Sequence, residues 1–177
     1  MDTIVNTLKA YLPPGDGYLP YYIFGLAVIS VGNSLQNYFT LHYTRRIYNG
    51  QFVPNPSLPP KSADFDPEDS TRKLAPASTA NAKGGRTTDQ LTPLAGRLFS
   101  TYTFMAAIVR LYASYNLHLA PVYNMAIWTY VIALFHFASE WAVYRTAYLS
   151  LPILFPFFLA TVGIYWMTSQ YSFYVQA

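Results

Sequence analysis

The sequence predicts an all-α membrane protein, with four transmembrane helices in a small bundle and one long flexible loop. The first observation is composition: of 177 residues, 11% are charged, 53% hydrophobic and 18% aromatic, whereas soluble domains carry about 25% charged residues. The second is distribution, because the charges gather in one central stretch and beside long apolar runs. The third is that these runs approach or exceed the ~20 helical residues that a bilayer crossing requires.

The chain begins with a short segment, residues 1–17, followed by a first span with its basic flank, residues 18–46. The first segment has no long apolar run behind a basic leader, so we do not expect a cleavable signal peptide. Residues 18–41 are 24 uncharged residues, which is long enough to cross the hydrocarbon core as a helix. Arg45 and Arg46 then mark a membrane surface.

Residues 47–93 are predicted to be a flexible loop, because prolines, small polar residues and charges dominate them. Residues 94–177 follow as three further spans that form a single membrane domain with the first. The second span, residues 94–115, is the least apolar, since Arg97 and Arg110 leave only 12 uncharged residues between them. This helix is expected to need the next span as its partner.

The third and fourth spans are predicted from uncharged stretches near the end of the chain. Residues 117–139 carry no charge and are followed by Glu140. Residues 146–177 carry none either, and Pro152 and Pro156 are expected in the first turns of their helix, where a missing amide proton is tolerated.

Lysine and arginine counts predict the orientation, because short loops rich in these residues stay in the cytosol. The turn near residues 117–121 has neither residue, whereas the long loop and its flanks hold most of them, and Arg145 lies on the loop's side. We therefore expect the long loop in the cytosol and both termini on the opposite side. The basic residues of the loop and its flanks are Arg45, Arg46, Lys61, Arg72, Lys73, Lys83, Arg86 and Arg97.

Composition also excludes several function classes. The net charge of +3 comes from basic residues beside apolar spans, not from a basic stripe with interleaved aromatics, so nucleic-acid binding is not expected. The chain has no cysteine, which rules out disulfides, thiolate metal sites and cysteine nucleophiles. No phosphate-binding loop, dinucleotide fingerprint, zinc-protease motif or serine-hydrolase motif occurs. We expect no cofactor.

Charged residues inside the spans need partners or an exit to the headgroups. If the second and third spans form a hairpin that turns near residues 117 and 118, Arg97 lies close to the depth of Glu140, and we predict an ion pair between them near the cytosolic interface. Arg110 lies at the depth of Met125 by the same argument. We expect its side chain to extend to the nearer headgroups and anchor the helix there.

His136 and Glu140 are four residues apart and share a helix face. A metal site would need three or four ligands, and three histidines without cysteine do not supply an obvious set. An acid–base pair is chemically possible, because burial can bring a carboxylic acid towards a neutral pKa. The alternative that we favour is structural: these groups hydrogen-bond between helices and hold the bundle in register.

A polar face is predicted on the first span. Gly32, Asn33, Gln36 and Asn37 recur at helical spacing, so two or more carboxamides lie beside a residue without a side chain. Such a face packs on protein rather than lipid, since a small residue permits close approach and the amides can bond across the interface. The partner could be internal or another protein. The many tyrosines and tryptophans are expected in interfacial belts.

Three segments carry a family resemblance. They are Gly32-Asn33-Ser34-Leu35-Gln36, then Leu94-Ala95-Gly96-Arg97-Leu98-Phe99 through Thr103 to Arg110, and last Trp128-Thr129 with His136-Phe137-Ala138-Ser139-Glu140 and Val143-Tyr144. In order and spacing they resemble the ergosterol biosynthetic protein 28 family, small membrane proteins of the endoplasmic reticulum. The resemblance covers most of the chain outside the long loop, and the segment from Trp128 is its most specific part.

The resemblance implies a non-enzymatic scaffold that tethers the sterol C4-demethylation enzymes to the endoplasmic reticulum. The implied partners are a C4-methyl sterol oxidase, a C3-sterol dehydrogenase that decarboxylates at C4, a 3-keto-sterol reductase and, as a further contact, a sterol C24-methyltransferase. Two rival functions remain. One is an intramembrane sterol- or lipid-modifying enzyme, such as an isomerase that uses His136 and Glu140, and the other is a small transporter.

Overall fold

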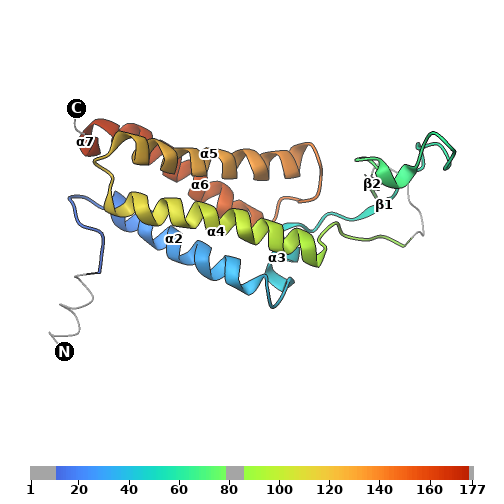
Figure 1. The fold of residues 1–177 in the computed structure, drawn as a ribbon, viewed down its shortest axis with the longest axis horizontal. Helices are drawn as coiled ribbons and strands as arrows, with labels where there is room; N and C mark the ends of the chain where they lie inside the picture. Colours follow the sequence, from blue (N-terminus) through green and yellow to red (C-terminus); the bar gives the residue numbers. More distant parts are fainter. Residues whose placement is uncertain (1–10, 79–85, 176–177) are drawn as a thin grey trace.

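The computed structural model describes residues 11–78 and 86–175, and these are mostly helical. Figure 1 shows the long helices α2, α4, α5 and α6 lying along one another as an elongated bundle, with α7 at one end and α3 with the strands at the other. Helix α2 packs chiefly on α4 and helix α5 on α6, and contacts between α4 and α5 join the two pairs. The helices are α2 (Leu19–Gln36), α3 (His42–Ile47), α4 (Pro93–Tyr115), α5 (Ala120–Ala142), α6 (Leu151–Ser169) and α7 (Tyr171–Tyr174), with a 3-10 helix η1 (Pro67–Asp69) and strands β1 (Phe52–Pro54) and β2 (Leu74–Pro76).

Within the described residues, two helices are long and apolar enough to cross a membrane. They are α5, with 23 residues, and α6, with 19. The other two predicted spans form helices but are more polar: α2 carries Asn33 and Gln36 near its end, and α4 carries Arg97 and Arg110. The described fold is therefore a mainly helical bundle with two candidate membrane-spanning helices.

The ends of two predicted spans are corrected by the structure. The first helix stops at Gln36 and does not continue to residue 41, because the Asn37 side chain accepts a 2.5 Å hydrogen bond from the Thr44 hydroxyl and the chain turns into α3. The last long helix begins at Leu151 rather than residue 146. Pro152 lies in its first turn as predicted, whereas Pro156 lies inside the helix.

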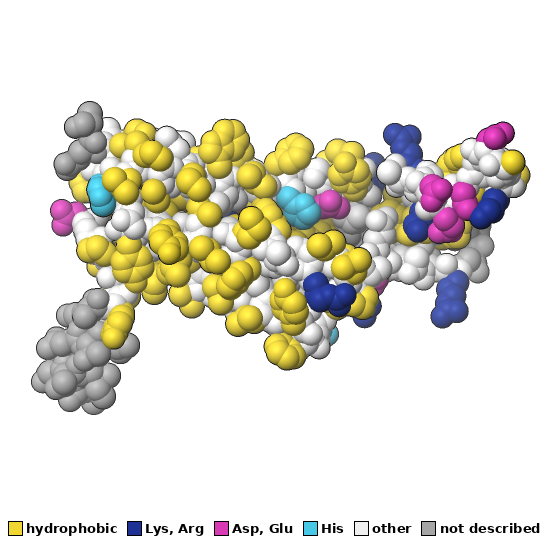
Figure 2. Space-filling view, viewed as in Figure 1, with side chains coloured by type: hydrophobic (Ala, Val, Ile, Leu, Met, Phe, Trp, Pro, Cys, Tyr) yellow, Lys and Arg dark blue, Asp and Glu magenta, His cyan; other side chains and the backbone are white. Residues whose placement is uncertain are grey.

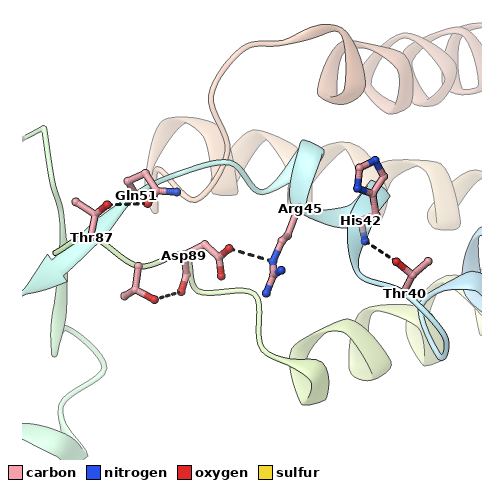
Figure 3. A network of polar contacts seen from close by, with 7 residues as sticks. Thr40, His42, Arg45, Gln51, Thr87 and Asp89 are labelled. Atoms are coloured by element: carbon pink, nitrogen blue, oxygen red, sulfur yellow. Dashed lines mark hydrogen bonds and ion pairs between the residues drawn. The ribbon is translucent and has the colours of Figure 1, made fainter.

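The long loop is more structured than predicted. Strands β1 and β2 form an antiparallel hairpin in which Phe52 pairs with Pro76 and Pro54 with Leu74, and the Phe52 side chain is buried. Neighbouring segments attach to the helices, since Arg45 of α3 forms an ion pair with Asp89 (Nε to Oδ2, 3.1 Å) just before α4 (Figure 3). The prediction of a wholly flexible segment is therefore wrong for these residues, and residues 79–85 lie outside the described part.

A backbone contact holds the start of the loop against the turn between α5 and α6. The Gly50 amide donates to the Thr146 carbonyl at 2.8 Å, and the Tyr148 amide donates to the Asn49 side chain at 2.8 Å. A Cβ at Gly50 would lie 2.9 Å from two backbone atoms of Thr146. Arg145 beside it has φ of 57°, a left-handed conformation that is unusual for a residue with a side chain. We call these residues, 49–50 with 145–148, the loop clamp.

The surface of the bundle and the surface of the loop differ in chemistry. Figure 2 shows apolar side chains over the helices, whereas acidic and basic side chains gather at the end that carries the strands. Many large apolar side chains on the helices are exposed, including Phe135 and Tyr165. Such an extended apolar surface is typical of a protein that contacts lipid or other proteins.

Candidate functional site

A cavity of about 630 Å³ lies between α4 and α5 near the loop. Both polar residues singled out on α5, His136 and Glu140, line it, and Tyr48 closes it from the end of α3. The rest of the wall is largely apolar and aromatic, with Phe99 and Tyr102 contributed by α4. We call this the imidazole cavity.

The imidazole of His136 is held by a hydroxyl from another part of the chain. Tyr48 Oη lies 2.6 Å from His136 Nε2, and either group can supply the proton, depending on the imidazole tautomer. The rings of Phe99 and Phe137 pack around this pair. Burial, with a smaller contribution from the negative charge of Glu140, raises the pKa of the Tyr48 phenol well above its usual range. The phenol is therefore neutral at physiological pH.

The predicted Arg97–Glu140 ion pair is not formed. Glu140 instead accepts a hydrogen bond from the Thr146 hydroxyl, while Arg97 is exposed on α4, and no ion pair of either residue occurs within the described residues. Equal distance from a hairpin turn sets the depth of two residues but not the direction in which each side chain points. Successive residues rotate by about 100° around a helix axis, and Arg97 faces outward.

Arg110 also lies elsewhere than predicted. Its side chain is 8% exposed and points into the bundle, where Nε donates to Thr129 Oγ1 at 2.9 Å and the guanidinium carbon lies 4.3 Å from the centre of the Tyr130 ring. The predicted extension to the headgroups is wrong because the Cα–Cβ bond tilts towards the N-terminus of a helix. For a residue near the C-terminal end of α4, that direction leads away from the nearer membrane surface.

The predicted polar face of α2 divides into two parts. Asn37 is used inside the chain, with Thr44, and Gln36 donates to Asn33 at 2.7 Å along the same helix. Gly32 is exposed, and among the residues that the structure describes no atom would lie within 4 Å of a Cβ placed there. No internal helix uses the close approach that Gly32 permits.

Two residues beside the buried guanidinium had no predicted role. Thr129 belongs to the resemblance but was not linked to Arg110, and Tyr130 is one of 17 tyrosines, which carries no signal without knowledge of the facing helix. Trp128, which belongs to the resemblance, is 62% exposed on the outer surface of α5. The described residues contain no group of three or more histidines, aspartates or glutamates arranged to hold a metal ion.

The fold and the site define a class: a small helical protein with two candidate membrane-spanning helices, an apolar exterior, and ionisable residues inside the bundle. Comparison with known proteins makes the assignment specific. Residues 19–165 match the family model described as "Erg28 like protein", so the chain belongs to this family. No solved structure matches the chain.

Curated relatives of nearly the same length support this assignment. The chain is 53% identical to the ergosterol biosynthetic protein 28 of Gibberella zeae over 172 residues. This alignment covers 97% of this chain and 99% of the relative. It is 30% identical to the protein of the same name in Candida albicans, over 90% of this chain and 89% of the relative. For the Saccharomyces cerevisiae protein the identity is 26%, over 98% and 93%. The chain therefore belongs to a family named for ergosterol biosynthesis.

Proposed function

We propose that this protein is a non-enzymatic membrane scaffold that holds the sterol C4-demethylation enzymes together at the endoplasmic reticulum. The observation that carries the proposal is the match to ergosterol biosynthetic proteins over almost the whole chain. A scaffold accelerates consecutive steps by raising the effective concentration of each enzyme near the product of the one before. This gain is greatest for intermediates that are poorly soluble in water.

The architecture proposed for this role has four membrane-spanning helices, α2, α4, α5 and α6. Helices α5 and α6 qualify by length and composition alone. For α4, the support is that Arg110 is covered by protein, since a charge that faces a neighbouring helix is tolerated in a membrane where one that faces lipid is not. With the loop in the cytosol, both termini face the lumen, and the β1–β2 hairpin extends from the cytosolic end of the bundle (Figure 1).

Two surfaces suit partner enzymes. One is the α2 surface at Gly32, which is open in the described chain and would let a second helix approach closely. The other is the charged loop end that Figure 2 shows, which could contact cytosolic domains. The partners that we propose are the C4-methyl sterol oxidase, the C3-sterol dehydrogenase/C4-decarboxylase, the 3-keto-sterol reductase and, as a further contact, the sterol C24-methyltransferase.

Affinity purification of the tagged protein from membranes in mild detergent tests the scaffold. We expect recovery of the C4-demethylation enzymes, and accumulation of C4-methylated or 3-keto sterols in a deletion strain. Gly32→Leu should reduce recovery of at least one partner without lowering the abundance of the protein, because the new side chain meets open space within the described chain. Thr161→Leu, at an exposed position of α6, is the matched control and should leave recovery unchanged.

Glu140→Ala separates an architectural role from a catalytic one. It removes the acceptor of the Thr146 hydroxyl and should weaken assembly or lower abundance, while each purified partner keeps its own turnover. Normal assembly combined with blocked sterol conversion would count against the scaffold.

A second candidate is an intramembrane sterol- or lipid-modifying enzyme, such as an isomerase. The observation that favours it is the imidazole cavity, which presents His136 and Glu140 on one wall. It requires sterol turnover by the purified chain alone, lost in His136→Gln. If the purified protein converts no sterol but restores conversion by the assembled enzymes, the scaffold is supported instead.

A further inference from the structure

A second cavity, of about 270 Å³, lies at the centre of the bundle among α2, α4, α5 and α6. Its wall is mostly apolar, with Leu26, Phe137 and Leu159 among the lining residues, but it also contains the guanidinium of Arg110. It is separate from the imidazole cavity, although Phe99 and Tyr102 contribute to both walls. We call it the arginine cavity.

The charge of Arg110 has no counter-ion in the described chain. Besides Thr129 Oγ1, its partners are the Thr129 carbonyl, 3.3 Å from Nη2, Ser30 Oγ, 3.5 Å from Nη1, and the face of the Tyr130 ring, whose centre lies 4.3 Å from the guanidinium carbon. All of these are neutral, and no carboxylate of the described residues lies within ion-pair distance. A guanidinium has five N–H donors, so at least two remain unused. A buried charge without a compensating one is strongly unfavourable.

Two further polar groups beside this cavity are buried without a hydrogen-bond partner in the described residues. Tyr102 Oη and Tyr130 Oη are buried and have no hydrogen-bond partner within the described residues, and both tyrosines line the arginine cavity. Buried hydroxyls are almost always satisfied by protein, water or a ligand. One cavity thus combines an uncompensated cation with two unpartnered hydroxyl donors, which together are suited to an anion.

The cavity opens on the apolar exterior rather than on the charged end. Ile29 of α2 and Phe155 of α6 line it and are 57% and 58% exposed, so the opening lies between these two helices. In the proposed membrane placement this opening faces the acyl chains. A molecule that enters there must have an apolar body.

We propose that the arginine cavity binds an amphiphile by its oxyanion, a carboxylate or phosphate group, seated against Arg110 with its apolar body extending between α2 and α6. The planar guanidinium suits bidentate binding of either group. The volume of the arginine cavity is slightly below the ~300–1,000 Å³ of typical ligand pockets. The cavity therefore accommodates only the anionic head and its first carbons, and the rest of the molecule lies along the helices. The inference uses the proposed membrane placement but not the scaffold role.

Binding to the purified full-length protein in dodecyl maltoside tests this, because no partner enzyme is needed. Dodecanoate and dodecyl phosphate are the two anionic probes, and methyl dodecanoate is the matched neutral one. We expect saturable binding of an anionic probe, seen by native mass spectrometry, at least tenfold tighter than that of the ester. Extraction of lipids from the purified protein then identifies the natural source, a free fatty acid or other carboxylate on one hand and an anionic phospholipid on the other.

Variants keep the test independent of folding. Arg110→Gln should reduce the affinity for the anionic probes at least tenfold and abolish the preference over the ester. Ala133→Leu adds a larger side chain to the cavity wall on α5 while Arg110 itself is retained, and it should also weaken binding tenfold. Ala142→Leu, at an exposed position of the same helix, should not. Tyr102→Phe removes a single hydroxyl and should weaken binding of the anions more than of the ester.

Three results would overturn the proposal. One is that neither dodecanoate nor dodecyl phosphate binds more tightly than methyl dodecanoate, and another is undiminished binding of the anionic probe in folded Ala133→Leu protein. The third is absence of both bound lipid and probe binding in folded wild-type protein, which would mean that water alone occupies the cavity. None of these three results depends on whether partner enzymes are recovered in the purification described above. The scaffold proposal and the anion-binding proposal can therefore be refuted independently of each other.

Discussion

Replacing Gly50 by alanine should destabilise the protein sharply, because the loop clamp leaves no space for a side chain. The new Cβ would lie 2.9 Å from Thr146 Cα and from its carbonyl carbon, and closer still to the Arg145 carbonyl oxygen. Carbon atoms in contact normally lie about 3.5–4.0 Å apart. The colliding atoms are backbone atoms, so no side-chain rotation can relieve the overlap.

The magnitude follows from what must move. Separating the two segments by about half an ångström weakens the 2.8 Å hydrogen bond from the Gly50 amide to Thr146, worth about 1 kcal/mol. The remaining overlap costs about 1–3 kcal/mol, as in overpacked cores. Alanine lowers the conformational entropy of the unfolded chain, which stabilises the folded state by about 0.4–1 kcal/mol. We expect a net loss of about 2 kcal/mol in the free energy of unfolding.

The matched control is Gly32→Ala, where the new Cβ meets no atom within 4 Å among the described residues. This change removes a glycine from a helix interior, so it should be neutral or stabilise by up to about 1 kcal/mol. Unfolding of both variants can be followed by circular dichroism in dodecyl maltoside micelles titrated with sodium dodecyl sulfate. The Tyr148 amide donates a hydrogen bond to the Asn49 side chain. The rate of hydrogen exchange at this amide therefore reports whether the loop clamp remains closed. If both variants unfold at the same detergent fraction, the packing argument is wrong.

Three further changes test other parts of the structure. Gly163→Ala places a Cβ 3.0 Å from the buried Tyr130 ring, so thermal unfolding in detergent should show a loss of about 1 kcal/mol; a stabilised variant would show that the ring can retreat. Thr129→Val removes the hydroxyl that accepts from the buried guanidinium and should cost about 1–3 kcal/mol in the same assay, whereas Thr129→Ser should cost less. The hydrogen bond from Lys61 and one from a backbone amide lower the pKa of Asp66, so its stabilising contribution is present above the ordinary Asp pKa and is lost only as the pH falls through the lowered value. Carboxyl NMR should show this low pKa and its rise in Lys61→Ala; an unchanged pKa in that variant would refute the assignment.

The helical bundle was predictable because it depends on runs of residues. Uncharged stretches specify α5 and α6 wherever they fall in space, and a single proline such as Pro152 marks where a helix can begin. The β1–β2 hairpin gave no comparable signal, because each strand has three residues and prolines end both. The two strands are separated by about twenty residues, and their pairing is accompanied by burial of the Phe52 side chain. The composition of either strand alone does not indicate this burial.

The candidate site was predictable only in part, for a geometric reason. His136 and Glu140 were singled out because intramembrane ionisable residues are rare, and both line one cavity. Their partners were not found, because Tyr48 and Thr146 come from turns whose positions depend on the loop clamp. For Arg97 and Arg110, sequence gives the depth along a helix, but the facing direction decides whether the charge meets solvent, lipid or protein.

If α4 spans the membrane as proposed above, the position of Arg110 has a consequence for how the chain is made. Its neutral partner Ser30 on α2 is synthesised before it, but Thr129 on α5 follows 19 residues later. An arginine within a membrane-spanning helix opposes insertion, although less near the end of the helix than at its centre. At about 5–20 residues per second, α4 would wait roughly one to four seconds for its acceptor. Insertion of α4 and α5 as one unit, rather than one helix at a time, would avoid exposing the charge of Arg110 to lipid. The rate of translation between Arg110 and Thr129 would then influence how many chains reach the correct topology.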